Sequence, residues 1–136
     1  MFLIDTNVIS ELFKADKADP KVREWAASNE QYEMYTSTLV IMEIEKGVLL
    51  RERKDLAQAA KLRHWFDRVV IKGFHDRILA VDVAVALCCA KMDVPDPKCM
   101  TDSLIAATAI TNRLTLVTRN TKDFELTGAM LLNPWL

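Results

Sequence analysis

Phe2-Leu3-Ile4-Asp5-Thr6-Asn7, at residues 2–7, leads from three apolar residues directly into a carboxylate and a polar turn. Three apolar residues in a row are typical of a short strand that is buried on both faces. Asp, Thr and Asn accept hydrogen bonds from free amide groups, so they favour the start of a helix, which we predict over Thr6–Phe13. The opening of the chain therefore predicts a strand and a helix with a carboxylate at their junction.

The same alternation of short strands and helices continues to the end of the chain. Strands joined through helices imply a mostly parallel sheet with helices on both faces. The sequence therefore predicts an α/β fold in a single domain over residues 1–136. The other predicted strands are Met34–Thr36, Arg77–Val81, Thr115–Thr118 and Met130–Leu132, and the other predicted helices are Pro20–Ser28, Ser37 or Thr38 to about Leu50, Asp55 to about Val69, Val83–Met92 and Asp102–Asn112.

Composition disfavours several classes of protein. The 136 residues are 51% hydrophobic, which is enough for a core without disulfide or metal cross-links. The three cysteines, two of them adjacent, indicate reduced thiols. Without an apolar leader or a membrane-spanning stretch, we expect a cytoplasmic protein with no membrane partner. Only three glycines are present, and none forms a phosphate-binding loop.

Charge is unevenly distributed although the formal net charge is only −1. Residues 1–45 carry four basic side chains against nine acidic ones, whereas residues 46–72 carry eight basic against three acidic. A basic segment beside an acidic one favours guidance of a polyanion toward a metal site. A solvated helix face with mixed charges explains residues 46–72 equally well.

Four carboxylates stand where apolar segments meet turns or on the apolar side of a helix, a costly place for a charge without a partner. Glu43 shares its helix face with Val40, whereas Glu45 points about 200° round the helical wheel. Together the four suit Mg²⁺ or Mn²⁺ at the carboxyl edge of the sheet, and hence phosphoryl chemistry. They are Asp5, Glu43, Asp102 and Asp123.

Each of these carboxylates also has an ordinary explanation. Asp5, Asp102 and Asp123 are suitable as helix caps or as acids in the first turn of a helix. Glu43 has Lys46 three residues on, at the spacing of a surface ion pair. The hypothesis of a shared cation therefore rests on all four converging.

Five segments, in this order and spacing, resemble the PIN-domain ribonucleases, and specifically the VapC-like toxins of bacterial toxin–antitoxin pairs. Together they extend over nearly the whole chain. They are Phe2–Glu11, Ile41–Val48, Thr101–Ala109, Leu116–Phe124 and Leu132–Trp135.

The resemblance implies a PIN-like three-layer fold and a metal-dependent endoribonuclease that hydrolyses RNA phosphodiester bonds. It implies that Asp5, Glu43 and Asp102, helped by Asp123, bind one or two Mg²⁺ or Mn²⁺ ions and act in catalysis. Family members often carry an acid where this chain has Asn120, so the fourth ligand is Asp123 directly, Asp123 through water, or absent. It further implies that Thr6, Asn7, Thr118 and Asn120 orient waters or ligand oxygens around the ion, and that Lys46 and Arg119 contact RNA or antitoxin.

The resemblance also implies partners: an RNA substrate, a cognate antitoxin that inhibits the toxin, and a homodimer or a larger complex with the antitoxin. The apolar face of residues 56–66 and the first helices offer a dimer surface, unless that face is plain core. The alternative function is a catalytically weak or inactive PIN-like module that binds an antitoxin or nucleic acid. The RNA that is cut and the identity of the antitoxin stay open.

Overall fold

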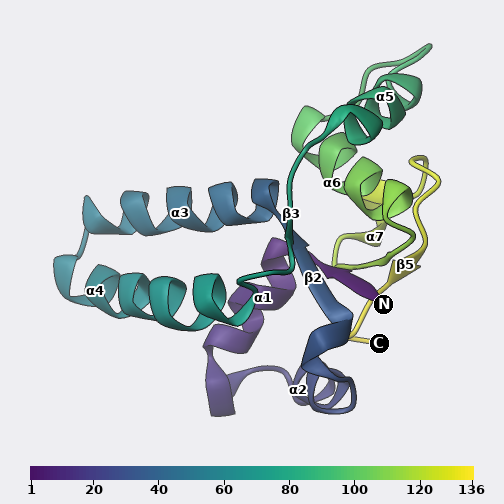
Figure 1. Ribbon diagram of the computed structural model, residues 1–136. Coiled ribbons are helices and arrows are strands. Elements are labelled where there is room, and N and C mark those ends of the chain that lie inside the picture. Colours follow the sequence, from purple (N-terminus) through teal and green to yellow (C-terminus); the bar gives the residue numbers. More distant parts are fainter.

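The computed structural model describes residues 1–136 and is built around a five-stranded sheet in which all neighbouring strands are parallel (Figure 1). The strand order is β3-β2-β1-β4-β5, so β1 lies at the centre. The predicted α/β fold with a mostly parallel sheet is confirmed. The strands are β1 (Phe2–Ile4), β2 (Met34–Ser37), β3 (Ile78–Leu79), β4 (Thr115–Val117) and β5 (Leu131–Leu132).

Seven α-helices surround the sheet, and most of them begin at a polar cap, as the sequence predicts. Asp5, Asp19, Ser37, Asp55 and Asp82 each accept a hydrogen bond from a backbone amide at the start of the helix that follows. The helices are α1 (Thr6–Phe13), α2 (Pro20–Ala27), α3 (Thr38–Glu52), α4 (Leu56–Trp65), α5 (Val83–Met92), α6 (Met100–Thr111) and α7 (Thr121–Phe124).

Three short helical segments complete the fold: 3₁₀ turns η1 (Ala15–Lys17) and η2 (Gln31–Glu33), and a π-helical segment η3 (Phe66–Ile71) that extends α4. None of the helices combines the length and the apolar character needed to cross a membrane.

Most predicted boundaries differ from the structure by one or two residues, and three predicted elements differ in a way that affects the fold. The strand predicted at Arg77–Val81 is only Ile78–Leu79, because its neighbour β2 ends at Ser37 and offers no further backbone groups to pair with. The helix predicted from Asp55 to Val69 changes to π geometry at Phe66. The helix predicted to begin at Asp102 begins at Met100, which places Asp102 in its first turn.

The core is centred on β1 and β4, whose residues Leu3, Ile4, Leu116 and Val117 are almost fully buried. The Thr36 hydroxyl in β2 is also buried and donates a hydrogen bond to the Ile4 carbonyl at 2.9 Å. Helices cover both faces, so these strands are apolar throughout instead of alternating. The central strand that leads to Asp5 is therefore held rigidly on both sides.

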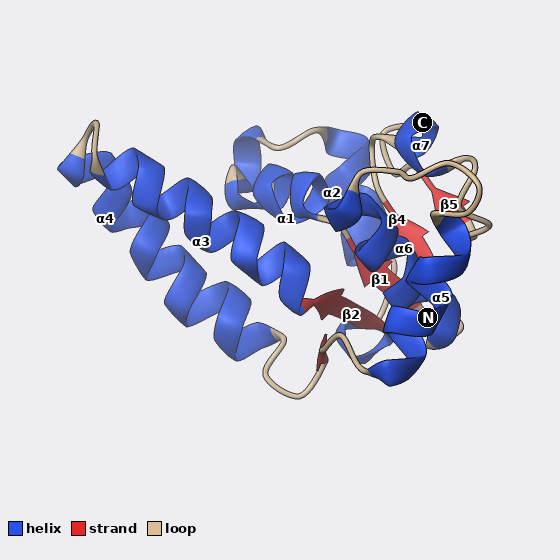
Figure 2. Ribbon diagram, turned by 90° about the horizontal axis from the view of Figure 1, so that it is seen from above, coloured by secondary structure: helices blue, strands red, loops and turns tan.

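Helices α3 and α4 form an antiparallel hairpin that projects to one side of the molecule, opposite α5 and α6 (Figures 1 and 2). The apolar face predicted over residues 56–66 is mainly core in its second half. Phe66 is buried, and the Trp65 ring packs on Phe13 with 4.7 Å between ring centroids. Leu56, by contrast, is 74% exposed.

Candidate active site

The four predicted carboxylates come from four separate segments and line one hollow of about 220 Å³. Asp5 follows β1 directly, Glu43 lies in the second turn of α3, Asp102 in the first turn of α6, and Asp123 in α7. The remaining lining residues are Thr6, Asn7, Asn120 and Phe124. No Lys, Arg or His side chain lines the hollow, so it is strongly acidic.

Parallel strands explain why these segments meet. The carboxyl ends of β1, β2 and β4 lie at one edge of the sheet, and the chain leaves them at Asp5, at the start of α3 and at Thr118. Asp102 arrives differently, because α6 follows a loop after α5 and not a strand.

Asp5 is held by hydrogen bonds to both of its carboxylate oxygens. Its Oδ1 accepts from the Thr6 amide at 2.8 Å, and its Oδ2 accepts from the Thr118 hydroxyl at 2.8 Å. Asp5 is only 6% exposed, and Thr118 is fully buried. The carboxylate is therefore fixed in orientation before any ligand binds.

Thr118 is the centre of a polar network that joins α1 to the loop after β4. Its hydroxyl accepts hydrogen bonds from the Asn7 side-chain amide at 3.2 Å and from the Asn120 backbone amide at 3.1 Å. The Asn7 side-chain oxygen in turn accepts from the Arg119 amide at 3.2 Å. Asn7 thus acts on Thr118 and the loop, and not directly on Asp5.

The electrostatics of the hollow oppose ionisation of its carboxylates. Burial raises the pKa of Asp5, and the charges of Asp102 and Asp123 raise it further against the two hydrogen bonds. Burial also raises the pKa of Glu43, and the charge of Asp5 raises it further. The nearby Thr6 hydroxyl and the charge of Lys46 act in the opposite direction and lower this pKa. Burial and the Asp123 charge raise the pKa of Asp102. A cation in the hollow would remove this penalty.

The donor chemistry of the hollow fits a hard divalent cation, which prefers carboxylate, hydroxyl and amide oxygens. The Thr6 hydroxyl, buried at the same place, makes no hydrogen bond to any protein atom. No three of the acidic, His or Cys side chains converge closely enough to hold one ion directly. A bound ion would accordingly keep several waters, as Mg²⁺ does in proteins. The predicted ligand roles of Asp5, Glu43, Asp102 and Asp123 stay a prediction.

The ordinary explanations of the acids apply in part. Asp5 does cap α1, and Asp102 and Asp123 do lie in first turns, but each also lines the hollow. The ion pair considered between Glu43 and Lys46 is absent, since Glu43 takes part in none of the ion pairs of the structure. The opposite direction of Glu45 is confirmed, because Glu45 pairs with Arg63 on α4.

Lys46 and Arg119, predicted to contact RNA or antitoxin, do not line the hollow. Arg119 lies beside it, with its guanidinium carbon 5.0 Å from the centre of the Trp135 ring. The Asn133 side chain donates to the Arg119 carbonyl at 3.4 Å. Phe124, a lining residue, and Trp135 were not predicted. Both depend on chain segments meeting in space, and an aromatic residue type does not show from the sequence which segment its ring will meet.

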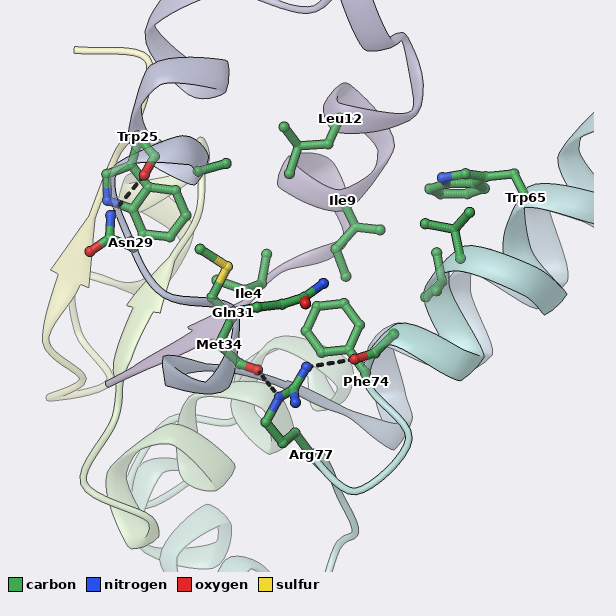
Figure 3. Close-up of a pocket in the computed structure, with 14 residues that line it drawn as sticks. Ile4, Ile9, Leu12, Trp25, Asn29, Gln31, Met34, Trp65, Phe74 and Arg77 are labelled. Carbon is green, nitrogen blue, oxygen red and sulfur yellow. Dashed lines mark hydrogen bonds between the residues drawn. The ribbon is translucent and has the colours of Figure 1, made fainter.

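A second cavity, of about 340 Å³, is apolar and lies between α1, α2 and the α4–η3 segment (Figure 3). Arg77 lies at its edge, where it donates to the carbonyls of Met34 and Gly73. Its lining includes Trp25, Trp65 and Phe74 and no carboxylate. It is therefore separate in chemistry from the acidic hollow.

Comparison with known proteins decides the family. The family model of the PIN domain matches residues 2–129. The chain belongs to the PIN domain family. The resemblance seen in the sequence is thereby confirmed, and PIN-domain membership agrees with the parallel sheet and its acidic carboxyl edge.

Individual PIN-domain relatives match over almost the whole length. The chain is 31% identical to Toxin FitB of Neisseria gonorrhoeae over 99% of both chains. It is 29% identical to VapC ribonuclease Y4jK of Sinorhizobium fredii over 99% of this chain and 98% of the other. The crystal structure of FitAcB from Neisseria gonorrhoeae superposes with a TM-score of 0.90 at 30% identity, again over 99% of both chains.

The raised pKa values predict how stability depends on pH. Lowering the pH from neutral toward 4.5, the ordinary pKa of a glutamate, is expected to raise the melting temperature of the protein in EDTA. Folding raises the pKa of Asp5, Glu43 and Asp102 above 3.8, 4.5 and 3.8, so between those values and the raised ones the folded chain binds more protons than the unfolded chain. The gain in stability is complete when the pH lies below the ordinary pKa values of these carboxylates. Scanning calorimetry measures the melting temperature at each pH.

The control is Asp5→Asn, which removes one of the three groups and should flatten the rise. Glu11 and Glu45 act in the opposite sense, because Lys14 and Arg63 lower their pKa values by hydrogen bonding. Their contribution is lost only as the pH falls below about 4.5, through the lowered values. A melting temperature that falls steadily from neutral pH to pH 4.5 would contradict the prediction.

Proposed function

We propose that residues 1–136 act as one PIN domain that hydrolyses RNA phosphodiester bonds, as the toxin of a toxin–antitoxin pair. The observation that carries the proposal is the meeting of Asp5, Glu43, Asp102 and Asp123 in one hollow without a basic side chain. It is supported by the similarity to a VapC ribonuclease and to Toxin FitB. A cognate antitoxin is the partner that this function requires.

Mg²⁺ or Mn²⁺, when bound, would lower the pKa of a water and offset charge on the reacting phosphate. The four carboxylates would hold the ion partly through waters, and Asp5 would do so in an orientation fixed by Thr6 and Thr118. Asn120 also lines the hollow, where it would orient a water or a ligand oxygen. Phe124, a buried lining residue, would help to exclude bulk water.

A second candidate function is a binding module without turnover. One observation favours it: no three carboxylates converge closely enough to hold an ion directly. Titration calorimetry with Mn²⁺ separates the two candidates, because an active site binds the ion and a degenerate one does not. Asp102→Asn serves as the reference for lost binding.

Expression of the wild-type chain and of Asp102→Asn in a bacterial host tests the proposed function itself. We expect the wild-type chain to arrest growth and Asp102→Asn to allow normal growth at equal protein level. Removing one negative ligand weakens ion binding while relieving repulsion in the hollow, so the variant stays folded. Mapping of RNA ends after induction should reveal new cuts only with the wild type. Equal arrest by both proteins would exclude metal-dependent cleavage as the cause.

A further inference from the structure

The α3–α4 hairpin, taken together with η3 and its C-cap Lys72, projects to one side of the molecule (Figures 1 and 2). Glu43, in the second turn of α3, lines the hollow, and Lys46 one turn later is close enough for its charge to act on Glu43. At 1.5 Å per residue, the end of α3 near Arg53 lies about 15 Å further along the helix axis. The hairpin therefore joins the hollow to a remote surface.

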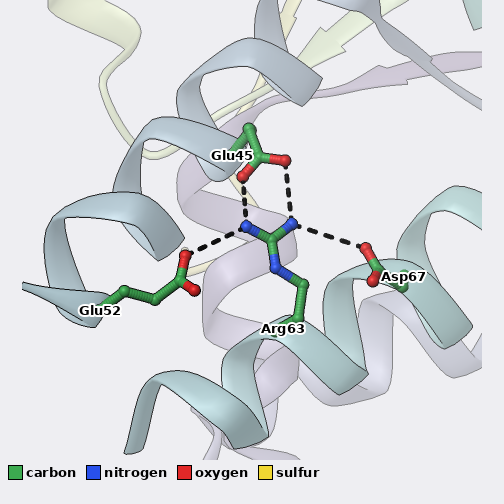
Figure 4. Close-up of polar contacts among 4 residues, drawn as sticks. All are labelled: Glu45, Glu52, Arg63 and Asp67. Atoms are coloured by element: carbon green, nitrogen blue, oxygen red, sulfur yellow. Dashed lines mark hydrogen bonds and ion pairs between the residues drawn. The ribbon is translucent and has the colours of Figure 1, made fainter. Parts of the chain in front are cut away.

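One arginine binds most of the acidic side chains of the hairpin (Figure 4). Arg63 on α4 donates to both oxygens of Glu45 at 2.9 and 2.6 Å and to Glu52 at 3.3 Å, and it lies 3.7 Å from Asp67. Of the two other acids, Asp55 caps α4 by accepting from the Gln58 amide at 3.1 Å, and Glu43 lines the hollow. Apart from Glu43, the negative charges of the hairpin are thus taken up by contacts within the chain.

The other basic side chains of the hairpin have no such partner. All seven are exposed and take part in none of the ion pairs of the structure. The excess of basic residues over positions 46–72 therefore leaves seven exposed positive charges without an ion-pair partner. The seven are Lys46, Arg51, Arg53, Lys54, Lys61, Arg68 and Lys72.

Free positive charge near the acidic hollow would offset the repulsion between the hollow and an RNA strand. A phosphodiester approaching four carboxylates is repelled, and a divalent ion offsets only part of that charge. Cations further along the polyanion, beyond the carboxylates, recover binding energy through phosphate contacts and counterion release. The cations at the tip of the hairpin lie about 15 Å beyond Glu43 along the helix axis, where they can contact such phosphates.

We propose that the α3–α4 hairpin is an RNA-backbone-binding arm, with Arg51, Arg53 and Lys54 at its tip contacting phosphates of the strand whose scissile bond lies in the hollow. This inference rests on the proposed ribonuclease function. Phosphate contacts carry little sequence information, so the arm contributes affinity and register, while the choice of cleavage sequence belongs to residues near the hollow.

The test replaces the tip cations together, in the variant Arg51→Gln/Arg53→Gln/Lys54→Gln. Binding of a 16-nucleotide fluorescein-labelled single-stranded RNA is followed by anisotropy in EDTA, so that no cleavage occurs. We expect the dissociation constant at about 100 mM salt to rise at least about tenfold. The slope of log K against log salt should become shallower by about 2, from about 0.7 per lost contact.

The matched control is Lys17→Gln/Lys21→Gln/Lys91→Gln, which removes the same charge from exposed positions on η1, α2 and α5. It should leave both the dissociation constant and the salt slope within about twofold of the wild type. Melting temperatures of both triple variants establish that they are folded. An equal effect of the two variants would overturn the arm, since it would reflect net charge alone.

Cleavage assays keep the failure of the arm apart from the failure of the ribonuclease function. An arm defect raises KM for RNA while kcat at saturating RNA stays unchanged. If the wild type cleaves RNA and the tip variant has the same KM and salt slope, the proposed RNA-binding arm is wrong, whereas the proposed ribonuclease activity is supported. If the wild type binds RNA through the tip and never cleaves it, the arm is supported and the ribonuclease activity is wrong. If the tip variant loses only binding to an oligoglutamate peptide, the surface serves an acidic protein segment and the RNA arm is overturned.

Discussion

Asp5→Asn is expected to lower metal-dependent RNA cleavage by at least about a thousandfold while leaving the fold intact. A loss of this size corresponds to about 4 kcal/mol of transition-state stabilisation. Asp5 is the most buried carboxylate of the hollow and the only one whose oxygens are both fixed by hydrogen bonds. Asparagine keeps the shape and the cap of α1 but removes the negative charge that an ion requires. Single-turnover cleavage at saturating Mn²⁺ measures the effect.

Asp82→Asn is the matched control for this substitution. Asp82 also caps a helix, accepting from the Val85 amide at 2.9 Å at the start of α5, but it does not line the hollow. We expect the Asp82 variant to cleave at the wild-type rate. In EDTA, Asp5→Asn should melt at a higher temperature than the wild type, because carboxylate repulsion is relieved. Undiminished turnover of purified Asp5→Asn would exclude a role for Asp5 in the reaction.

Thr118→Val is expected to weaken Mn²⁺ binding by about ten- to hundredfold, the range seen when a residue that orients a metal ligand is lost. Valine has nearly the shape of threonine, so packing beneath β4 changes little. The loss of the hydroxyl leaves Asp5 Oδ2 without its donor and the Asn7 side chain and Asn120 amide without their acceptor. Calorimetric titration measures the affinity, and Thr118→Ser, which restores the hydroxyl, should recover most of it.

Thr108→Val separates orientation of the ligand from simple destabilisation. The Thr108 hydroxyl is also buried, and it donates to the Leu104 carbonyl within α6 at 2.7 Å, away from the hollow. Both valine variants should lose about 1–3 kcal/mol of unfolding free energy at most, because each unpairs buried polar groups. Only Thr118→Val should change Mn²⁺ affinity. Equal affinities in the two variants would reduce Thr118 to a purely structural role.

Local sequence signals were sufficient for the central elements of the fold. The apolar run of β1 and the polar cap at Asp5 are adjacent in sequence, and both were predicted where they occur. The length of β3 was not predictable, because it depends on where β2 ends. The π geometry of Phe66–Ile71 was also missed, because Phe66 and Val70 are buried at a spacing that an ordinary α-helix gives equally well.

Asp5, Glu43 and Asp123 were predictable as a set, through the rule that the carboxyl ends of parallel strands share one edge, whereas Asp102 lies on a helix that follows no strand. The helical wheel separated Glu43 from Glu45 correctly, because both lie on one regular helix. Contacts between distant segments were not predictable. Arg63 binds Glu45 across 18 residues, and Thr118 binds Asp5 across 113 residues. Neither residue type shows from the sequence alone which partner it will meet.

The order in which the chain is made has a bearing on when this protein can act. Asp5 lies in the first strand, but the hydroxyl that fixes it is at Thr118, Asp123 completes the hollow, and the Arg119 loop is fastened by Asn133 and Trp135. During synthesis, Asp5 is added to the chain more than 100 residues before Thr118 and Asp123. The acidic hollow therefore cannot form until the segment from Thr118 to Asp123 has been synthesised and has packed against β1.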